Sequence, residues 1–249
     1  MEAAVNTELD EKKTAEQVLT EKIQSEHCFI GHPFGIGVLS FKFFMTSLTS
    51  YGMSAILIYY FYATGQEGGL GLSKIQASQM ITLNSALGAI FSVIGSYMAD
   101  RVFGNRRAYR FCTITGPFLY FLLAIPGLGM TAVILQYALG NINAMVCGSS
   151  LYTLMGKLYA KGDKRRDGAF AITYVLSNVG AMSPVVAGTL AKVAGYHFTF
   201  FVLGILAALG SLVYIIFEKR AFGPIGMEPD EPLPPVPSPS ASKVRLTEF

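Results

Sequence analysis

Charged residues are scarce in this sequence. They make up 14% of its 249 residues, against about 25% in an average soluble domain. Hydrophobic residues make up 52%, and the mean hydropathy is +0.45. A soluble protein of this composition would have to hide its apolar excess in one core beneath a largely polar surface. The composition excludes a disordered chain and a coiled coil, and it indicates a membrane protein that crosses the bilayer several times.

Cysteine, net charge and an N-terminal apolar core are also lacking. The three cysteines are too few for a disulfide scaffold and lie in or beside apolar stretches, so we interpret them as small apolar side chains (Cys28, Cys112 and Cys147). A net charge of +3 is too small to indicate nucleic-acid binding. The first 26 residues carry no apolar run, which argues against a cleaved signal peptide. Val18, Ile23 and the charges around them fit a surface helix.

Six apolar stretches are long enough to span a membrane, because a helix needs about 20 apolar residues to cross the hydrocarbon core. They are 36–63, 77–98, 109–128, 132–155, 169–193 and 198–217. We therefore expect an all-α membrane protein in three parts. These are a cytoplasmic N-terminal segment (1–35), a six-helix transmembrane bundle (36–217), and a cytoplasmic Pro- and Ser-rich tail or truncated central linker (218–249).

The distribution of Lys and Arg predicts the orientation of this bundle. The loops after the second, fourth and sixth spans are rich in basic residues, whereas the alternate loops carry only Lys74 and Lys192. Because basic loops stay in the cytoplasm, both termini are expected there. An even number of spans agrees with this, because it puts both termini on the same side of the membrane. The expected location is the cell (plasma) membrane.

The stretch GSYMADRVFGNRR follows the second span and resembles the G-x-x-x-D-R-x-x-G-R-R loop of the major facilitator superfamily. Small residues at its start permit close helix approach, and its acid and arginines can tie neighbouring helix ends together. The alternative is that these charges only obey the positive-inside rule. We expect a cytoplasmic gate made of Gly95, Asp100, Arg101, Gly104, Arg106 and Arg107, joined from the loop before the fifth span by Arg165, Arg166 and Asp167.

Four further stretches narrow the resemblance: GHPFG (31–35), SYGMSAIL (50–57), YYFYA (59–63) and GKLYAKGDKRRDGAFAITYVLSNVGAMSPVVAG (156–188). Together they are similar to the proton-dependent oligopeptide transporter family, in its bacterial di- and tripeptide branch, over about residues 29–230. Members have twelve core helices in two six-helix halves. The resemblance therefore implies the N-terminal half of that fold, built from two inverted three-helix repeats.

Several ionisable residues of that family pattern are missing. Anchored on Tyr51, the two acids of the first helix fall on Phe43 and Thr46 and its arginine on Ser47, while the lysine of the fourth helix falls on Gly148. No Asp or Glu lies within the six predicted spans, although such residues normally mark proton pathways. Apart from Arg110 and Lys192, which each lie one residue inside the end of a span, Lys42 is the one basic residue within the spans, and we interpret it as a lysine that extends to the interface. The candidates for a polar substrate cavity are Tyr51, Asn84, Tyr174 and Asn178, each of which could instead bond between helices.

Two functions from different classes fit these features. The first is a half-length form of a di-/tripeptide:proton symporter, holding small peptides against a second six-helix half that is a second copy or a separate C-terminal half. The alternative is a non-transporting membrane scaffold or decayed fragment. An enzyme is not expected, since the sequence shows no nucleophile–base pair, metal-ligand spacing or phosphate loop. No cofactor and no metal site are expected, and proton coupling, which the resemblance implies, conflicts with the missing charges.

Overall fold

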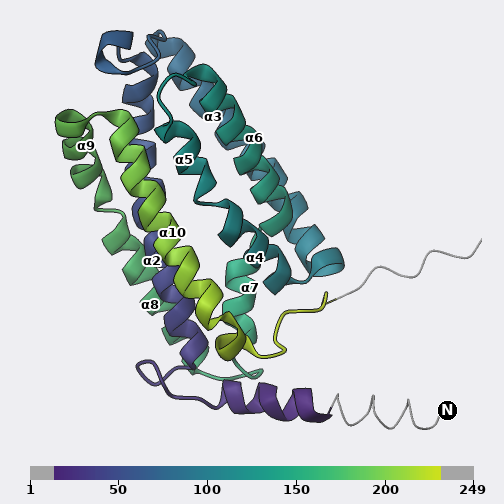
Figure 1. Ribbon diagram of the computed structural model, residues 1–249. Helices are drawn as coiled ribbons and strands as arrows, with labels where there is room; N and C mark the ends of the chain where they lie inside the picture. The colour runs from purple at the N-terminus through teal and green to yellow at the C-terminus, as the bar shows by residue number, and fades with distance from the viewer. Residues whose placement is uncertain (1–13, 231–249) are drawn as a thin grey trace, which may run out of the picture.

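The computed structural model describes residues 14–230 and forms an all-helical bundle (Figure 1). In that part of the chain the helices make six passes along the bundle, one at each predicted span. The passes are α2 (Phe34–Tyr62); α3 (Lys74–Met98) with the π-helical turn η2 (Ala99–Phe103); α4 (Asn105–Thr115) with α5 (Phe118–Ala124); α6 (Met130–Cys147) with α7 (Ser150–Lys157); α8 (Arg165–Gly180) with α9 (Ser183–Ala194); and α10 (Tyr196–Phe222). The short 3-10 helix η1 (Gly65–Glu67) lies between α2 and α3.

Four of these passes are long and apolar enough to cross a membrane by length and composition alone, namely 74–103, 130–157, 165–194 and 196–222. The other two are more polar or are interrupted. The middle of α2 is rich in Ser and Thr, and the α4–α5 pass breaks at Gly116 and Pro117. Proline breaks a helix because it has no N–H to donate and its ring clashes with the preceding turn.

The helix contacts follow the expected internal repeat. The first pass, α2, packs against the sixth pass, α10, and against the fifth pass, α8 and α9. The fourth pass, α6, packs against the third pass, α4 and α5, and against the second pass, α3. If passes one, two and three correspond to passes four, five and six, the contacts of α2 become the contacts of α6. The bundle is therefore two three-helix repeats, as the sequence predicts, and it matches the predicted fold class.

Two apolar clusters fill the two ends of the bundle. One contains Leu39, Leu154 and Phe222, and the other contains Tyr60 and Phe200.

Between the clusters the interior is polar and the helices are joined by side-chain hydrogen bonds. The hydroxyl of Ser40 bonds that of Thr173 at 2.9 Å, and the hydroxyl of Ser47 bonds that of Ser177 at 3.0 Å. Short polar side chains hold α2 to α8 without burying a charge at these positions.

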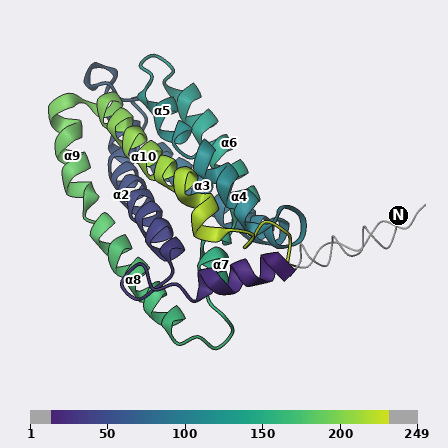
Figure 2. The same ribbon diagram turned by 60° about the horizontal axis from the view of Figure 1, so that its bottom comes forward.

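Loops 99–104 and 158–164 lie at the same end of the bundle as both ends of the described chain (Figure 1). We call this the basic end, because it carries most of the loop Lys and Arg residues. A helix over 14–24 lies across it (Figure 2), with Ile23 buried close to Gly223 at the end of α10.

The helix α10 continues to Phe222, beyond the end predicted at Phe217. The chain after it packs back onto the basic end, where the N–H of Arg106 donates to the carbonyl of Gly226 at 2.8 Å and that of Asp230 to the carbonyl of Asp100 at 2.9 Å. Residues 218–230 are therefore part of the folded unit. The rest of the predicted tail, 231–249, lies outside the described residues, as do residues 1–13.

Candidate substrate cavity and gate

The four cavity candidates lie on the surface of this six-helix unit. Tyr51 on α2 is 49% exposed, Tyr174 on α8 is 69% exposed, and Asn178 one turn further along α8 is also exposed. Asn84 on α3 is half-buried and accepts a hydrogen bond from the side-chain amide of Asn141 on α6 at 3.1 Å. The structure thus places Tyr174 and Asn178 together on one face and gives Asn84 a partner on a neighbouring helix.

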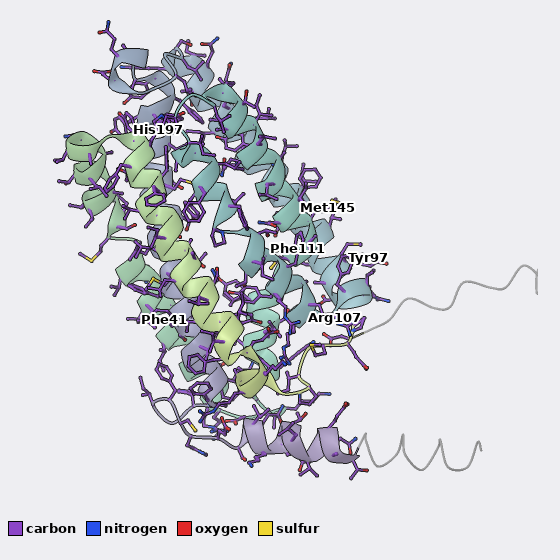
Figure 3. The ribbon with its side chains drawn as sticks, in the orientation of Figure 1. Phe41, Tyr97, Arg107, Phe111, Met145 and His197 are labelled. Atoms are coloured by element: carbon purple, nitrogen blue, oxygen red, sulfur yellow. The ribbon has the colours of Figure 1, made fainter. Side chains whose placement is uncertain are left out.

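Large apolar side chains are also exposed on the other faces of the unit. Figure 3 shows Tyr97 and Met145 projecting from the outer faces of α3 and α6, and both are more than a third exposed. Such a surface suits lipid or another apolar helical unit rather than water.

The positions that are ionisable in the family pattern hold aromatic and hydroxyl groups with local partners. Phe43 meets the ring of Tyr152 edge-on at 5.9 Å between centroids, and Tyr152 stacks on Phe170 at 6.4 Å. Ser47 is buried and bonds Ser177, while the Thr46 hydroxyl donates to the carbonyl of Lys42 at 2.9 Å. These contacts build an aromatic and hydroxyl-lined wall.

Lys42 is buried at 7% exposure rather than extending to solvent as expected. Its stem lies beside Gly210 of α10. It is therefore enclosed within the unit and does not face the surface that carries Tyr174.

The loop that resembles the superfamily motif begins at a backbone contact between two helices. A Cβ at Gly95 would collide with the carbonyl oxygen of Ala144, and the hydroxyl of Ser96 accepts a hydrogen bond from the N–H of Ser149 at 3.0 Å. Gly148 adopts a positive φ of 46° at the break between α6 and α7. These contacts hold the end of α3 against the junction between α6 and α7.

Asp100, Arg101 and Gly104 make short-range contacts in this loop. The Asp100 carboxylate accepts a hydrogen bond from the side-chain amide of Asn105 at 2.9 Å, which ties η2 to the first residue of α4. The guanidinium of Arg101 lies 5.8 Å from the centroid of the Tyr97 ring. Gly104 has a φ of 79°, and a Cβ there would lie 2.5 Å from the carbonyl oxygen of Met227, so only glycine suits this turn.

Arg106 belongs to a buried ionic cluster that also contains Glu218 and Arg110. The Arg106 Nε donates to the Glu218 carboxylate at 2.6 Å, and Arg110 donates to the same carboxylate through Nε and Nη2 at 2.8 Å. Arg106 also donates to the carbonyl of Gly223. The cluster joins α4 to the end of α10. Sequence reasoning missed Glu218, because the predicted sixth span ends one residue before it.

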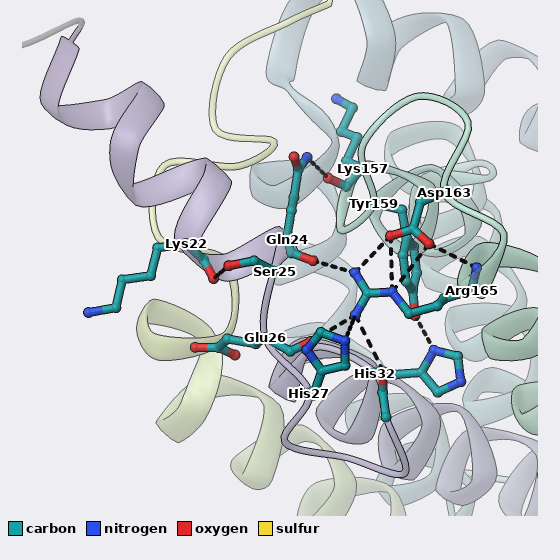
Figure 4. A network of polar contacts seen from close by, with 11 residues as sticks. Lys22, Gln24, Ser25, Glu26, His27, His32, Lys157, Tyr159, Asp163 and Arg165 are labelled. Atoms are coloured by element: carbon teal, nitrogen blue, oxygen red, sulfur yellow. Dashed lines mark hydrogen bonds and ion pairs between the residues drawn. The ribbon is translucent and has the colours of Figure 1, made fainter.

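Arg165 lies in a different network at the same end (Figure 4). It forms a two-point ion pair with Asp163, with the shorter contact at 2.7 Å. It also donates to backbone carbonyls of the N-terminal segment, at Gln24 and Glu26, and to the ring of His27. This network attaches the 158–164 loop to the segment that precedes α2.

The charges and burial of this network shift several pKa values. Hydrogen bonds from Arg165 hold the pKa of Asp163 below its usual range, and the same bonds raise the pKa of Arg165. Burial, followed by the charge of Arg165, lowers the pKa of His32, whose ring bonds the Tyr159 hydroxyl at 2.7 Å. Burial raises the pKa of Tyr159 to about 12.

The remaining gate candidates lie apart from both networks. Arg107 and Asp167 are exposed, and the guanidinium of Arg166 lies 5.8 Å from the Phe170 ring centroid. The structure therefore does not bring Arg165, Arg166 and Asp167 into contact with Asp100 and Arg101 as a single network. Among the described residues, no group of three or more His, Cys, Asp or Glu side chains is placed to hold a metal ion.

Comparisons with known proteins identify the family. The Major Facilitator Superfamily pattern matches residues 39–246. A di-/tripeptide transporter of Lactococcus lactis is 32% identical over 213 residues, which cover 84% of this chain and 43% of the relative. The uncharacterized transporter YclF of Bacillus subtilis is 33% identical over 206 residues, covering 82% of this chain and 42% of YclF.

The fold agrees with solved transporters. The crystal structure of the peptide transporter POT in complex with sulfate superposes with a TM-score of 0.83 at 32% identity, over 93% of this chain and 47% of that protein. The chain spans less than half the length of the relatives it matches. It belongs to the Major Facilitator Superfamily and, within it, is similar to one half of the proton-dependent oligopeptide transporters.

Proposed function

We propose that this six-helix unit is the N-terminal half of a peptide transporter and moves small peptides when paired with a second six-helix unit. That unit continues the same polypeptide, is a separate C-terminal half, or is a second copy. The observation that carries the proposal is the surface formed by α2 and α8. Tyr51, Tyr174 and Asn178 expose polar groups there within an otherwise apolar, membrane-embedded surface. A site of this kind becomes a cavity only when a second unit covers it.

The orientation of the proposed half-transporter follows from its charges. The basic end lies in the cytoplasm of a cell whose plasma membrane contains the protein, because Lys- and Arg-rich loops are retained on that side. Asp100, Arg101 and the neighbouring residues then form a cytoplasmic gate, which the second unit must touch and release as the two units rock.

Weak or uncoupled transport is expected rather than strong proton symport. A peptide carboxylate would meet no positive charge at the positions of Ser47 and Gly148, where the family pattern carries an arginine and a lysine, so it would depend on neutral hydrogen bonds. A neutral hydrogen bond contributes about 1 kcal/mol, whereas one to a charged group contributes about 1.5–3 kcal/mol. Losing two such charges weakens carboxylate binding at that site by a few kcal/mol, on the order of a hundredfold.

Uptake into proteoliposomes tests the proposal. With an inward proton gradient, the chain alone should show no concentrative dipeptide uptake. Co-expression with a matching C-terminal half should give uptake that equilibrates without concentrating. Asn178→Ala should then lower the rate about fivefold, the equivalent of one neutral hydrogen bond.

Thr189→Ala is the matched control, because Thr189 is an exposed polar residue of the same pass that bonds only the carbonyl of Val185 in its own helix. It should leave uptake unchanged. Correct membrane insertion of both halves without any uptake would contradict the transporter and favour a non-transporting scaffold. Strong concentrative uptake by the chain alone would contradict both the need for a second unit and the effect assigned to the lost charges.

A further inference from the structure

A cavity of about 1500 Å³ opens at the basic end, apart from the surface that carries Tyr51 and Asn178. Its lining residues come from helix 14–24, from α7 and the 158–164 loop, from the start of α8, and from the segment 224–230. Small-molecule sites are usually about 300–1,000 Å³. This cavity is therefore large enough for a short peptide with room for different side chains.

Three of the cations that line the cavity have no carboxylate partner among the described residues. Arg107, Lys161 and Arg166 line it and are exposed, and none of them is in an ion pair with a residue of 14–230. Arg166 is the best positioned of the three, because its guanidinium rests on the Phe170 ring and beside Gly156. Its donors are available for a bidentate carboxylate contact.

Acidic residues also line the cavity, and two of them come from helix 14–24. Glu16 and Glu21 line the cavity, and neither side chain accepts a hydrogen bond from a described residue. The helix is held in place at its end, where the side-chain amide of Gln24 donates to the carbonyl of Lys157 at 3.0 Å. The helix that carries both acids is therefore fixed relative to α7.

Two aromatic residues, Tyr152 and Phe170, also line the cavity. Tyr152 is 50% exposed and stacks on Phe170 with an interplanar angle of 14°. Aromatic faces supply apolar contact for a side chain without fixing its identity.

The helix α8 runs from this cavity to the exposed polar residues of the proposed transport site. Arg166, Phe170, Tyr174 and Asn178 follow one another at intervals of four residues along α8, so they lie on one face of the helix. At about 1.5 Å per residue this row is roughly 18 Å long. It leads from the charged cavity to the exposed polar groups of the proposed transport site.

We propose that the basic-end cavity binds zwitterionic di- and tripeptides, with the peptide carboxylate at Arg166 and the peptide ammonium at Glu21. The inference rests on the proposed function and adds to it a second, charged binding site. Arg166 and Glu21 would thus supply, at the basic end, charges that the membrane-spanning segments lack. A peptide held there is poised to enter or leave along the α8 row.

Equilibrium binding to the purified chain in detergent tests this site, with isothermal titration calorimetry at low salt. The probe is L-alanyl-L-phenylalanine, compared with the same dipeptide blocked by an N-acetyl group and a C-terminal amide. The free dipeptide should bind at least about tenfold more tightly than the blocked one, since each charged contact is worth about a factor of ten. Arg166→Gln and Glu21→Gln should each weaken binding of the free dipeptide about tenfold and leave the blocked dipeptide unaffected.

Lys192→Gln is the matched control, because Lys192 is an exposed lysine in the last turn of α9 at the opposite end of the bundle. It should not change binding. Far-UV circular dichroism and a monodisperse elution profile establish that each variant is folded. No binding by the folded chain at millimolar dipeptide, equal binding of both dipeptides, or loss of binding in Asn178→Ala but not in Arg166→Gln would each overturn the cavity assignment. The uptake assay reports on the proposed function separately, because it requires the second unit and this experiment does not.

Discussion

Two arginine clusters stand at the same end of the bundle, and their surroundings differ sharply. In the cluster of Arg106, Arg110 and Glu218, the side chains of Arg106 and Glu218 are each 3% exposed. In the cluster of Arg165 and Asp163, the two side chains are 27% and 18% exposed. The first joins two spanning helices, α4 and α10, whereas the second joins a loop to the segment before α2.

The difference indicates two mechanical roles. A buried ion pair is costly to break, because removing one partner leaves an uncompensated charge in a medium of low dielectric constant. A partly exposed pair contributes little on its own, because water replaces the lost partner. The Arg106 cluster is therefore a fixed joint between α4 and the end of α10. The Arg165 cluster is an attachment that can open while the bundle stays folded.

The largest effect is expected from Glu218→Gln. It leaves two arginines without their shared carboxylate, one of them fully enclosed, and should lower the free energy of unfolding by about 3–5 kcal/mol. The measurement is an SDS titration of the purified protein in mixed micelles, followed by far-UV circular dichroism.

Two further variants sharpen this result. Arg106→Met combined with Glu218→Leu removes both enclosed charges and should recover most of the loss, since a buried pair replaced by apolar side chains is often neutral. Glu228→Gln changes an acid outside the cluster and should have a small effect. If Glu218→Gln were no more destabilising than Glu228→Gln, the fixed-joint interpretation would be wrong.

The sequence predicts the bundle well because the signal for each span is local. Each run of apolar residues must satisfy its own backbone hydrogen bonds in lipid, so its length and position are readable without knowledge of its neighbours. The internal repeat follows from the family resemblance, and the helix contacts agree with it.

The partners in the ion pairs could not be predicted from the local sequence. Glu218 is followed by Lys219 and Arg220, so the local pattern indicates the end of a span at Phe217. Its partner Arg106 lies 112 positions away, and only the fold brings the two together. Arg165 was expected near Asp100 because both are in basic loops, but it contacts Asp163 and the N-terminal segment. Periodicity predicts which face of a helix is buried, but not which loop lies nearest to it.

A smaller and more local effect is expected from Arg165→Ala. The substitution removes the hydrogen bonds to Gln24, Glu26 and Asp163, so the segment before α2 should detach from the 158–164 loop. Hydrogen exchange of residues 14–32 should become about tenfold faster, whereas exchange in α4 and α10 should not change. Lys164→Ala, at an exposed neighbouring lysine, is the control. Faster exchange throughout the bundle would contradict the separation of the two clusters.

The smallest effect is the pH dependence of the same attachment, and it depends on His32. Burial and the charge of Arg165 lower the pKa of His32 in the attached state, so at neutral pH the ring is uncharged and bonds Tyr159. Below about pH 6.5, the ordinary histidine pKa, the detached segment takes up a proton that the attached one does not. The attachment therefore loses stability as the pH falls through 6.5, until it reaches the lowered pKa of His32.

Hydrogen exchange of residues 24–32, corrected for the intrinsic pH dependence of exchange, should accordingly rise between pH 7 and pH 5, and His32→Gln should flatten that rise. The other ionisable groups of the network can be separated from this effect. The pKa of Asp163 is held below its usual range, so that carboxyl titrates only at lower pH, and the pKa of Tyr159 is raised to about 12. Arg165 keeps its charge throughout. His27 accepts a hydrogen bond from Arg165 at 3.2 Å, so His27→Gln is the necessary comparison. A pH dependence that disappears in His27→Gln and persists in His32→Gln would assign the response to the exposed ring rather than to the buried one.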